Sequence, residues 1–275
     1  MSLSAAARSE STKLFSTAMW WILAIVLIGY IGFTSAGLGF VFSASAAGDL
    51  PGRAQGAALP GGDTPALLYS LATSVGYVFP LLIGTLMVTA EFRHRTLTPT
   101  FLATPRRGLV LWAKSLVAVA IGVVYAVLAL IASVGPAAGF LTGFGQPTGL
   151  GASSTWAMLG RVVIAFALWA LLGIGVGALV RNQVAAVVIV LAFTQFLEPI
   201  ARVAGMFVEG LDPVLRYLPA AAGDALVGTS IYSASMGGTA SSDQLVWWAG
   251  GAVLLAYAVV LIVLGHLTSW RRDVE

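Results

Sequence analysis

Six long apolar segments constrain this chain more than any other feature of its sequence. Each holds about 20 or more mostly apolar residues, and a helix of that length, rising about 1.5 Å per residue, crosses the roughly 30 Å hydrocarbon core of a bilayer. We place the segments at 20–42, 67–90, 109–134, 156–180, 184–203 and 246–267. The sequence therefore predicts an all-α integral membrane protein in which residues 1–275 form a single transmembrane domain with six spans.

The charge content supports the same conclusion. Charged residues make up 9% of the 275 residues and hydrophobic residues 59%, whereas a soluble domain averages about 25% charged residues. So few charges cannot cover a water-facing surface, which excludes a soluble globular enzyme. The chain has no cysteine and two histidines, so we expect neither a disulfide framework nor a bound metal.

The basic residues predict the orientation of the chain in the membrane. An even number of spans puts both termini on one side, and ten of the fourteen Lys and Arg residues fall on that side. These are Arg8, Lys13, Arg93, Arg95, Arg106, Arg107, Lys114, Arg181, Arg271 and Arg272. The positive-inside rule then places both termini and the 91–108 loop in the cytoplasm.

Two segments allow alternative interpretations. Residues 20–42, followed by a small-residue stretch at 43–46, could be a secretory signal, but a signal core of about 7–15 residues is shorter than this run. We therefore expect an uncleaved first helix. The third outer loop, 204–245, contains apolar stretches at 213–218 and 220–227 that are too short to span. We expect short re-entrant or interfacial helices there, and the alternative is a plain extracellular loop.

The chain lacks the common motifs of enzymes. It has no G-x-x-x-x-G-K-[ST] loop to hold ATP phosphates, and no G-x-S-x-G or H-E-x-x-H sequence. Its basic residues form no stripe for nucleic acid. We therefore expect no enzymatic activity of its own, no cofactor bound by this chain and no nucleic-acid partner.

The stretch from Glu91 to Gly108 concentrates polar residues at a cytoplasmic helix end. Leu97, Phe101 and Leu102 add apolar contacts at spacings of four and five, and Pro105 ends the stretch. This pattern is typical of a short amphipathic helix on the membrane surface that faces a cytoplasmic partner. The alternative is an ordinary basic loop that only sets the topology.

These residues lead to a resemblance. The acidic Glu91 after span two, the Thr96–Leu97 pair, Pro105, the basic pair Arg106–Arg107 and a lysine in the next span resemble the permeases of ABC-2 type transporters. Two further segments, 8–21 and 217–226, are similar to the elbow-helix region with the first span and to the re-entrant region of that family. One departure is Arg95, where many members have glycine.

The resemblance implies the membrane subunit of a bacterial ABC exporter. A cytoplasmic ATPase subunit would bind ATP and Mg, and a second permease, a copy or a paralogue, would complete the dimer. The implied coupling residues are Glu91, Arg93, His94, Arg95, Thr96, Pro105, Arg106 and Arg107, and the implied elbow-helix contacts are Arg8, Glu10 and Lys13. A coupling helix between spans two and three would receive the work of the ATPase.

Charged residues within the spans are costly and need partners. Glu198 lies roughly 21 Å above the cytoplasmic end of span five by helix rise, and Arg161 lies at a similar depth in span four. Arg202 follows Glu198 by one helical turn. We expect Glu198 to pair with Arg161 or Arg202 and to brace spans four and five, unless span five ends early and leaves all three in the headgroup region.

The function expected from the resemblance is that of a permease, which forms the translocation path for a small amphipathic compound, drug or peptide. Aromatic residues of spans two and five are candidates to line the path, although a core or lipid-facing position is an alternative for each: Tyr77, Phe79, Phe193 and Phe196. The second hypothesis is a secondary transporter or channel that works without ATP, which would need several membrane-buried carboxylates. A membrane-embedded enzyme would need a polar cluster that the sequence does not show.

Overall fold

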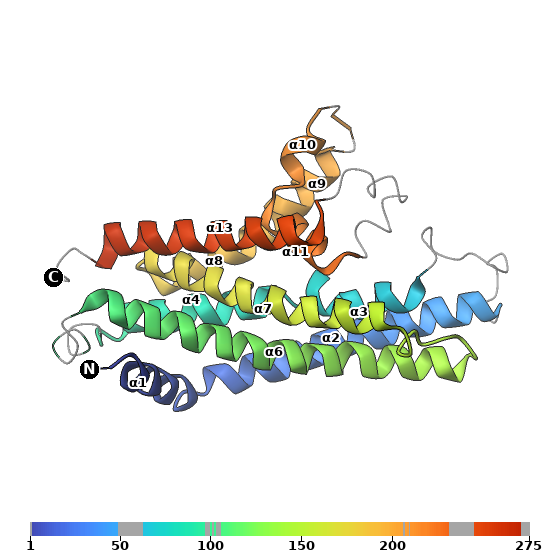
Figure 1. Ribbon diagram of the computed structural model, residues 1–275, viewed down its shortest axis with the longest axis horizontal. Coiled ribbons are helices and arrows are strands. Elements are labelled where there is room, and N and C mark those ends of the chain that lie inside the picture. Colours follow the sequence, from blue (N-terminus) through green and yellow to red (C-terminus); the bar gives the residue numbers. More distant parts are fainter. Residues whose placement is uncertain are drawn as a thin grey trace.

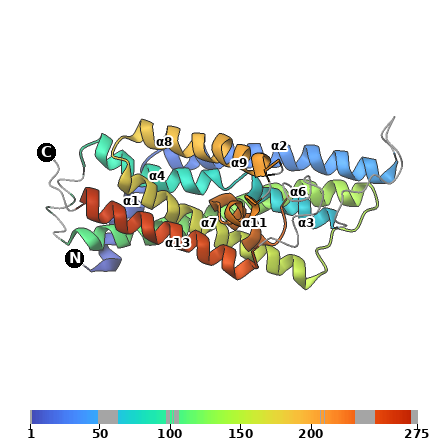
Figure 2. The same cartoon turned by 90° about the horizontal axis from the view of Figure 1, so that it is seen from above.

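The computed structural model describes residues 2–48, 63–96, 100, 102, 106–205, 207, 208, 210–230 and 245–270, and this part of the chain contains helices and no strands. The longest helices run side by side along one axis and form an elongated bundle (Figure 1). Figure 2 shows the same bundle from above, with α2 and α8 on one side and α13 on the other.

Six helical segments are long and apolar enough to cross a membrane, which confirms the predicted all-helical, six-span fold. They are Met19–Ala47 (α2), Thr64–Arg93 (α3, Thr64–Ser74, and α4, Val78–Arg93), Arg107–Gly143 (α6), Ser153–Leu179 (α7), Gln183–Gly205 (α8, Gln183–Ala192; the π-helix η1, Phe193–Leu197; α9, Glu198–Gly205) and Trp247–Thr268 (α13, Trp247–Gly265, with the start of the π-helix η3, His266–Trp270).

The third span is longer than the sequence predicted. The sequence prediction ended it at residue 134, but α6 continues to Gly143 with Pro136 inside the helix. The extension packs against α2, where Phe40 contacts Phe140 edge-on at a ring-centroid distance of 5.8 Å. This tertiary contact outweighs the single hydrogen bond and the local strain that the proline introduces.

Two spans are interrupted next to prolines. Span two breaks between Ser74 and Val78, one turn before Pro80, because a proline removes the hydrogen bond to the carbonyl four residues earlier and its ring crowds that carbonyl. Span five contains η1 directly before Glu198 and Pro199. Wider π-turns of this kind accommodate the missing donor, and they frequently mark functional sites.

The fourth span, α7, lies at the centre of the bundle, where its small residues allow the closest helix contact. A Cβ atom on Gly173 would meet the carbonyl oxygen of Leu81, and one on Gly177 would lie 2.6 Å from the carbonyl oxygen of Thr85. The small-residue motif Gly173-x-x-x-Gly177 therefore brings α7 against α4. Trp169 and Phe166 of α7 are fully buried in the surrounding core.

Short helices occupy the segment before the last span. They are α10 (Asp212–Leu215) and α11 (Pro219–Val227), close to the stretches that the sequence predicted. α11 is buried, with Ala222, Leu226 and Val227 in the core. It lies against α13, as Figures 1 and 2 both show, so this helix is part of the bundle and not a plain loop.

One end of the bundle gathers the N-terminal helix and the basic connections. The helix α1 (Leu3–Phe15) is seen almost end-on beneath the start of α6, so it runs across the direction of the spans (Figure 1). The end of α4, the start of α8 and the end of α13 lie at the same end. We call it the basic end, because Arg93, Arg95, Arg106, Arg107 and Arg181 belong to the segments located there.

Candidate functional site

Four charged side chains from three helices form a cluster at the basic end. The Nζ atom of Lys13 lies 2.7 Å from Oε1 of Glu10 and 2.8 Å from Oε1 of Glu91. The Nζ atom of Lys114 lies 2.5 Å from Oε2 of Glu10 and 3.0 Å from Oε1 of Glu91. We call these four residues the α1 charge cluster. Its two positive and two negative charges balance.

The local sequence explains how α1 reaches this cluster. Ser2 begins the helix, and its hydroxyl accepts a hydrogen bond from the backbone N–H of Ala5 at 3.3 Å. Ala6, Glu10 and Leu14 then recur every four residues and form the buried face of α1. A glutamate on an otherwise apolar face must find a cation, and Lys114 on α6 meets it there.

The cluster changes the pKa values of the α1 side chains. Burial alone would raise the pKa of Glu10, but the charges of Lys114 and Lys13 and their hydrogen bonds outweigh it, so this pKa lies below the usual value of 4.5. Burial would lower the pKa of Lys13, yet hydrogen bonds and charge from Glu10 and Glu91 raise it above 10.5. Both groups are therefore charged at neutral pH.

A cavity of about 300 Å³ opens beside the α1 charge cluster. Besides the four charged side chains, its walls include the polar residues Ser16, Thr17, His94 and Thr96 and apolar residues of α1 and α4. Oε2 of Glu91 is buried and has no hydrogen-bond partner among the described residues. Such an oxygen can accept a hydrogen bond from a group that enters the cavity.

The predicted coupling residues differ in how deeply the structure buries them. Glu91 is buried in the cluster, whereas Arg93, His94, Arg95, Thr96 and Arg106 are exposed and Arg107 is half-buried. Pro105 lies outside the described residues. Of the predicted elbow-helix contacts, Glu10 and Lys13 join Glu91, but Arg8 is exposed on the other face of α1. Three of these residues are therefore brought together.

Arg95 adopts an unusual backbone conformation at the turn that ends α4. Its φ angle is +53°, in the left-handed region, and no other non-glycine residue among those described has a positive φ. This is the position at which the resemblance led us to expect glycine, the residue that adopts such a φ without steric penalty. The turn is thus formed despite the arginine.

A second cluster lies where span five meets α11. Nη1 of Arg202 lies 2.8 Å from Oδ2 of Asp224, and its Nη2 lies 3.5 Å from Oε1 of Glu198. Oε1 of Glu198 also accepts hydrogen bonds from the backbone N–H groups of Ala220 at 2.6 Å and Ala221 at 3.1 Å. We call Glu198, Arg202 and Asp224 the α9–α11 charge cluster.

This arrangement decides between the two partners considered for Glu198. Arg202 approaches it, but Arg161 does not: its guanidinium lies over the Trp247 ring, 5.0 Å from the centroid. The pairing with Arg161 is therefore wrong. Helix rise estimates the position of a residue along a helix, but it does not fix the direction of a side chain around the helix axis, and Arg161 faces Trp247 of α13.

Sequence reasoning missed two members of these clusters. Asp224 was not considered as a partner of Arg202, and Lys114 was noted only among the basic residues that set the topology and in the family pattern. Each is a charged residue inside an apolar stretch, and such residues usually have an oppositely charged neighbour. That signal was present in the sequence for both.

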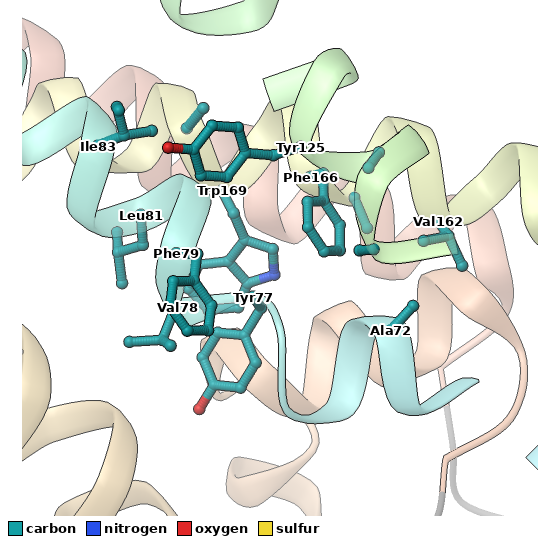
Figure 3. Close-up of a cluster of buried hydrophobic side chains, with 14 of the residues drawn as sticks. Ala72, Tyr77, Val78, Phe79, Leu81, Ile83, Tyr125, Val162, Phe166 and Trp169 are labelled. Carbon is teal, nitrogen blue, oxygen red and sulfur yellow. The ribbon is translucent and has the colours of Figure 1, made fainter. Parts of the chain in front are cut away.

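The four aromatic residues expected to line a translocation path do not lie together on one surface of this chain. Tyr77 and Phe79 are buried, and Tyr77 lies beside the Trp169 ring with centroids 4.6 Å apart (Figure 3). The hydroxyl of Tyr77 donates to the carbonyl oxygen of Thr194 at 3.0 Å. Phe193 and Phe196 point outward, with Phe196 65% exposed. Tyr77 and Phe79 are core residues, and the other two belong to an outer surface.

No family model matches this sequence, and no curated protein matches it. The resemblance to ABC-2 permeases therefore stays a prediction, and function must be argued from the two clusters. Among the described residues, no group of three or more His, Asp or Glu side chains is arranged to hold a metal ion. The clusters instead contain ion pairs that join helices distant in the sequence.

Proposed function

We propose that this chain is the membrane permease subunit of an ATP-driven exporter of the ABC-2 type in a bacterial plasma membrane, with both termini cytoplasmic. The observation that carries the proposal is the α1 charge cluster. It joins α1, α4 and α6 at the basic end and leaves a buried oxygen of Glu91 facing an open cavity.

The geometry suits the transmission of force. A load on the turn after α4 passes directly to Glu91, then through Lys13 and Lys114 to α1 and α6. Because buried ion pairs resist separation, the three helix ends move as one body. In this proposal α1 is the elbow helix, and the segment between α4 and α6 is the coupling helix that docks onto the ATPase.

The exposed apolar surface of span five supports a second permease subunit and membrane lipid as its neighbours. In span five only 22% of the most apolar stretch is buried within the chain. Phe193, Phe196 and Ile200 are exposed on it. A second permease, a copy or a paralogue, would cover part of this face, and membrane lipid the rest. The translocation path for a small amphipathic compound, drug or peptide then lies between the two permeases, which explains why one chain does not enclose it.

A direct test uses the natural absence of cysteine. Single cysteines replace Arg95, at the basic end, and Asp63, the exposed cap of α3 at the opposite end. The chain is co-expressed with the products of the genes that flank its own, among which we expect a phosphate-loop ATPase, and treated with a short thiol–amine cross-linker. We expect the ATPase to co-purify and to cross-link through position 95 and not through 63. Failure to co-purify, or cross-linking through 63, contradicts the proposal.

A second candidate function is an ATP-independent secondary transporter. One observation favours it: Asp224 adds a second buried carboxylate beside Glu198, and ion-coupled transport needs such groups. The two functions separate in liposomes that contain only this chain. Flux driven by an ion gradient without any ATPase would support the second candidate.

A further inference from the structure

The α9–α11 charge cluster is unbalanced, unlike the α1 charge cluster. It contains two carboxylates, Glu198 and Asp224, and one guanidinium, that of Arg202. All three are largely shielded from solvent, and Glu198 is 2% exposed. A buried net charge is costly, and a protein usually removes it by binding a counter-ion or a proton.

Among the described residues, no ion pair joins Arg161 or Arg216 to Glu198 or Asp224, and the Arg216 guanidinium lies over the Tyr217 ring at 5.2 Å from the centroid. Tyr77, in the break of span two, lines the same cavity as Arg202, and its hydroxyl donates to the carbonyl oxygen of Thr194. Arg161 of α7 lies at the far end of α11, next to Gly228 and over Trp247. The N-terminus of α11 offers roughly half a positive charge to Glu198. Among the described residues, the cluster therefore keeps an excess of about half a negative charge.

The hydrogen bonds identify which carboxylate oxygen is left over. Asp224 receives Arg202 at 2.8 Å and the side chain of Ser230. Oε1 of Glu198 receives two backbone N–H groups of α11. Oε2 of Glu198 is buried and has no partner among the described residues.

The surroundings of Oε2 suit a hydroxyl donor. A cavity of about 10 Å³ lies beside Glu198, and Ser74 of α3 lines the same cavity. The Ser74 hydroxyl oxygen is also buried without a partner among the described residues. This volume is at the lower limit for one water molecule. The Ser74 hydroxyl can donate its own hydrogen to an ionised Oε2 or accept one from a protonated Oε2, directly or through that water, so the excess charge of the cluster decides between the two states.

We propose that the α9–α11 charge cluster is a binding site for one proton, held on Oε2 of Glu198. The proton comes from water, neutralises the excess charge and turns an unsatisfied acceptor into a donor toward Ser74. Oε1 keeps its hydrogen bonds to α11, so the protonated side chain still holds α11 against α9. This inference needs no ATPase and stands whichever transport function is correct.

Proton binding is thereby linked to the docking of α11. Loss of the proton leaves a buried negative charge, which favours separation of α9 from α11 and entry of water. Since the docked form binds more protons than the open form, falling pH stabilises the docked form and rising pH stabilises the open one.

The test is infrared difference spectroscopy of the full chain in lipid nanodiscs at neutral pH. A protonated carboxyl has a carbonyl stretch that an ionised one lacks. We expect this band in the unchanged protein, and its loss in Glu198→Gln. We also expect its loss in Asp224→Asn, although Glu198 is still present, because Arg202 then balances Glu198 alone. Asp63→Asn, at an exposed carboxylate, is the matched control and keeps the band.

Other outcomes decide against the proposal. A band that survives both Glu198→Gln and Asp224→Asn, or no such band in the unchanged protein, shows that the cluster is not protonated. A band lost in Glu198→Gln and kept in Asp224→Asn shows that charge balance is not the cause. If Glu198→Gln does not fold, Asp224→Asn and the disappearance of the band from the unchanged protein on raising the pH decide the question.

Discussion

The two charge clusters differ in balance and in enclosure. The α1 charge cluster has equal numbers of positive and negative groups and borders an open cavity of about 300 Å³, and the Lys13 side chain is 39% exposed. The α9–α11 charge cluster has an excess carboxylate and borders a cavity of only about 10 Å³, and its Arg202 side chain is 13% exposed. A balanced, more exposed cluster suits contact with another protein, whereas an unbalanced, more buried one suits binding of a proton.

The largest effect is expected at the most buried cation of the α1 charge cluster. Lys114→Met leaves Glu10 and Glu91 without their most deeply buried partner, and breaking such a pair costs about 3–5 kcal/mol. Thermal unfolding of the detergent-purified protein measures the loss. Lys13→Met is the matched control with a smaller loss, because Lys13 is partly exposed. Equal losses would contradict the central position given to Lys114.

A somewhat smaller effect is expected in the other cluster. Arg202→Met removes its one cation and should cost about 3 kcal/mol. Adding Asp224→Asn removes one of the carboxylates left without a partner, so the double variant should recover most of that loss in the same unfolding experiment. Simple addition of two separate losses would show that these residues are not coupled.

The α1 charge cluster should respond to pH only at the acidic and the basic extremes. Because the Glu10 pKa is lowered, its stabilisation is present above 4.5 and is lost as pH falls through the folded-state pKa. Because the Lys13 pKa is raised, its stabilisation is present below 10.5 and is lost as pH rises through the folded-state pKa. A spin label at Arg8→Cys should therefore report an immobile α1 between these limits and a mobile one outside them.

A label at Ser153→Cys, an exposed position at the start of α7, is the control for that titration. It should stay unchanged over the same range. Mobility of α1 that changes near neutral pH would mean that the α1 charge cluster is not balanced as described.

The smallest effect is expected at the turn after α4. Arg95→Gly removes the side chain from a backbone with φ of +53° and should stabilise the protein by up to about 1 kcal/mol. Arg95→Ala removes the same charge but keeps a Cβ atom, so it should bring no gain. Equal stabilities of the two variants, measured by thermal unfolding, would assign the effect to charge and not to backbone strain.

The fold was largely predictable because apolar length alone identifies spans. The exceptions have local causes: the extension of α6 past Pro136 depends on contact with Phe40, and the break in span two lies one turn before Pro80. Neither can be read from hydropathy, since the first depends on a partner helix and the second on where the proline ring meets the preceding turn.

The sites were less predictable. Arg202 could be placed near Glu198 because one helical turn separates them on one helix. Asp224 and Lys114 come from other helices, and their directions depend on how α11 and α6 rotate against their neighbours. The outward position of Phe193 and Phe196 has the same origin, because η1 shifts the register of span five before Glu198.

The central claim is that the chain moves cargo only when an ATPase acts on the α1 charge cluster. The direct measurement is uptake of a fluorescent amphipathic amine by liposomes that contain the chain, with and without its co-purified ATPase and ATP. We predict uptake only with both, and its loss in Glu91→Ala although that variant still inserts into the membrane. Uptake by the chain alone, or normal ATP-driven uptake in Glu91→Ala, would contradict the claim.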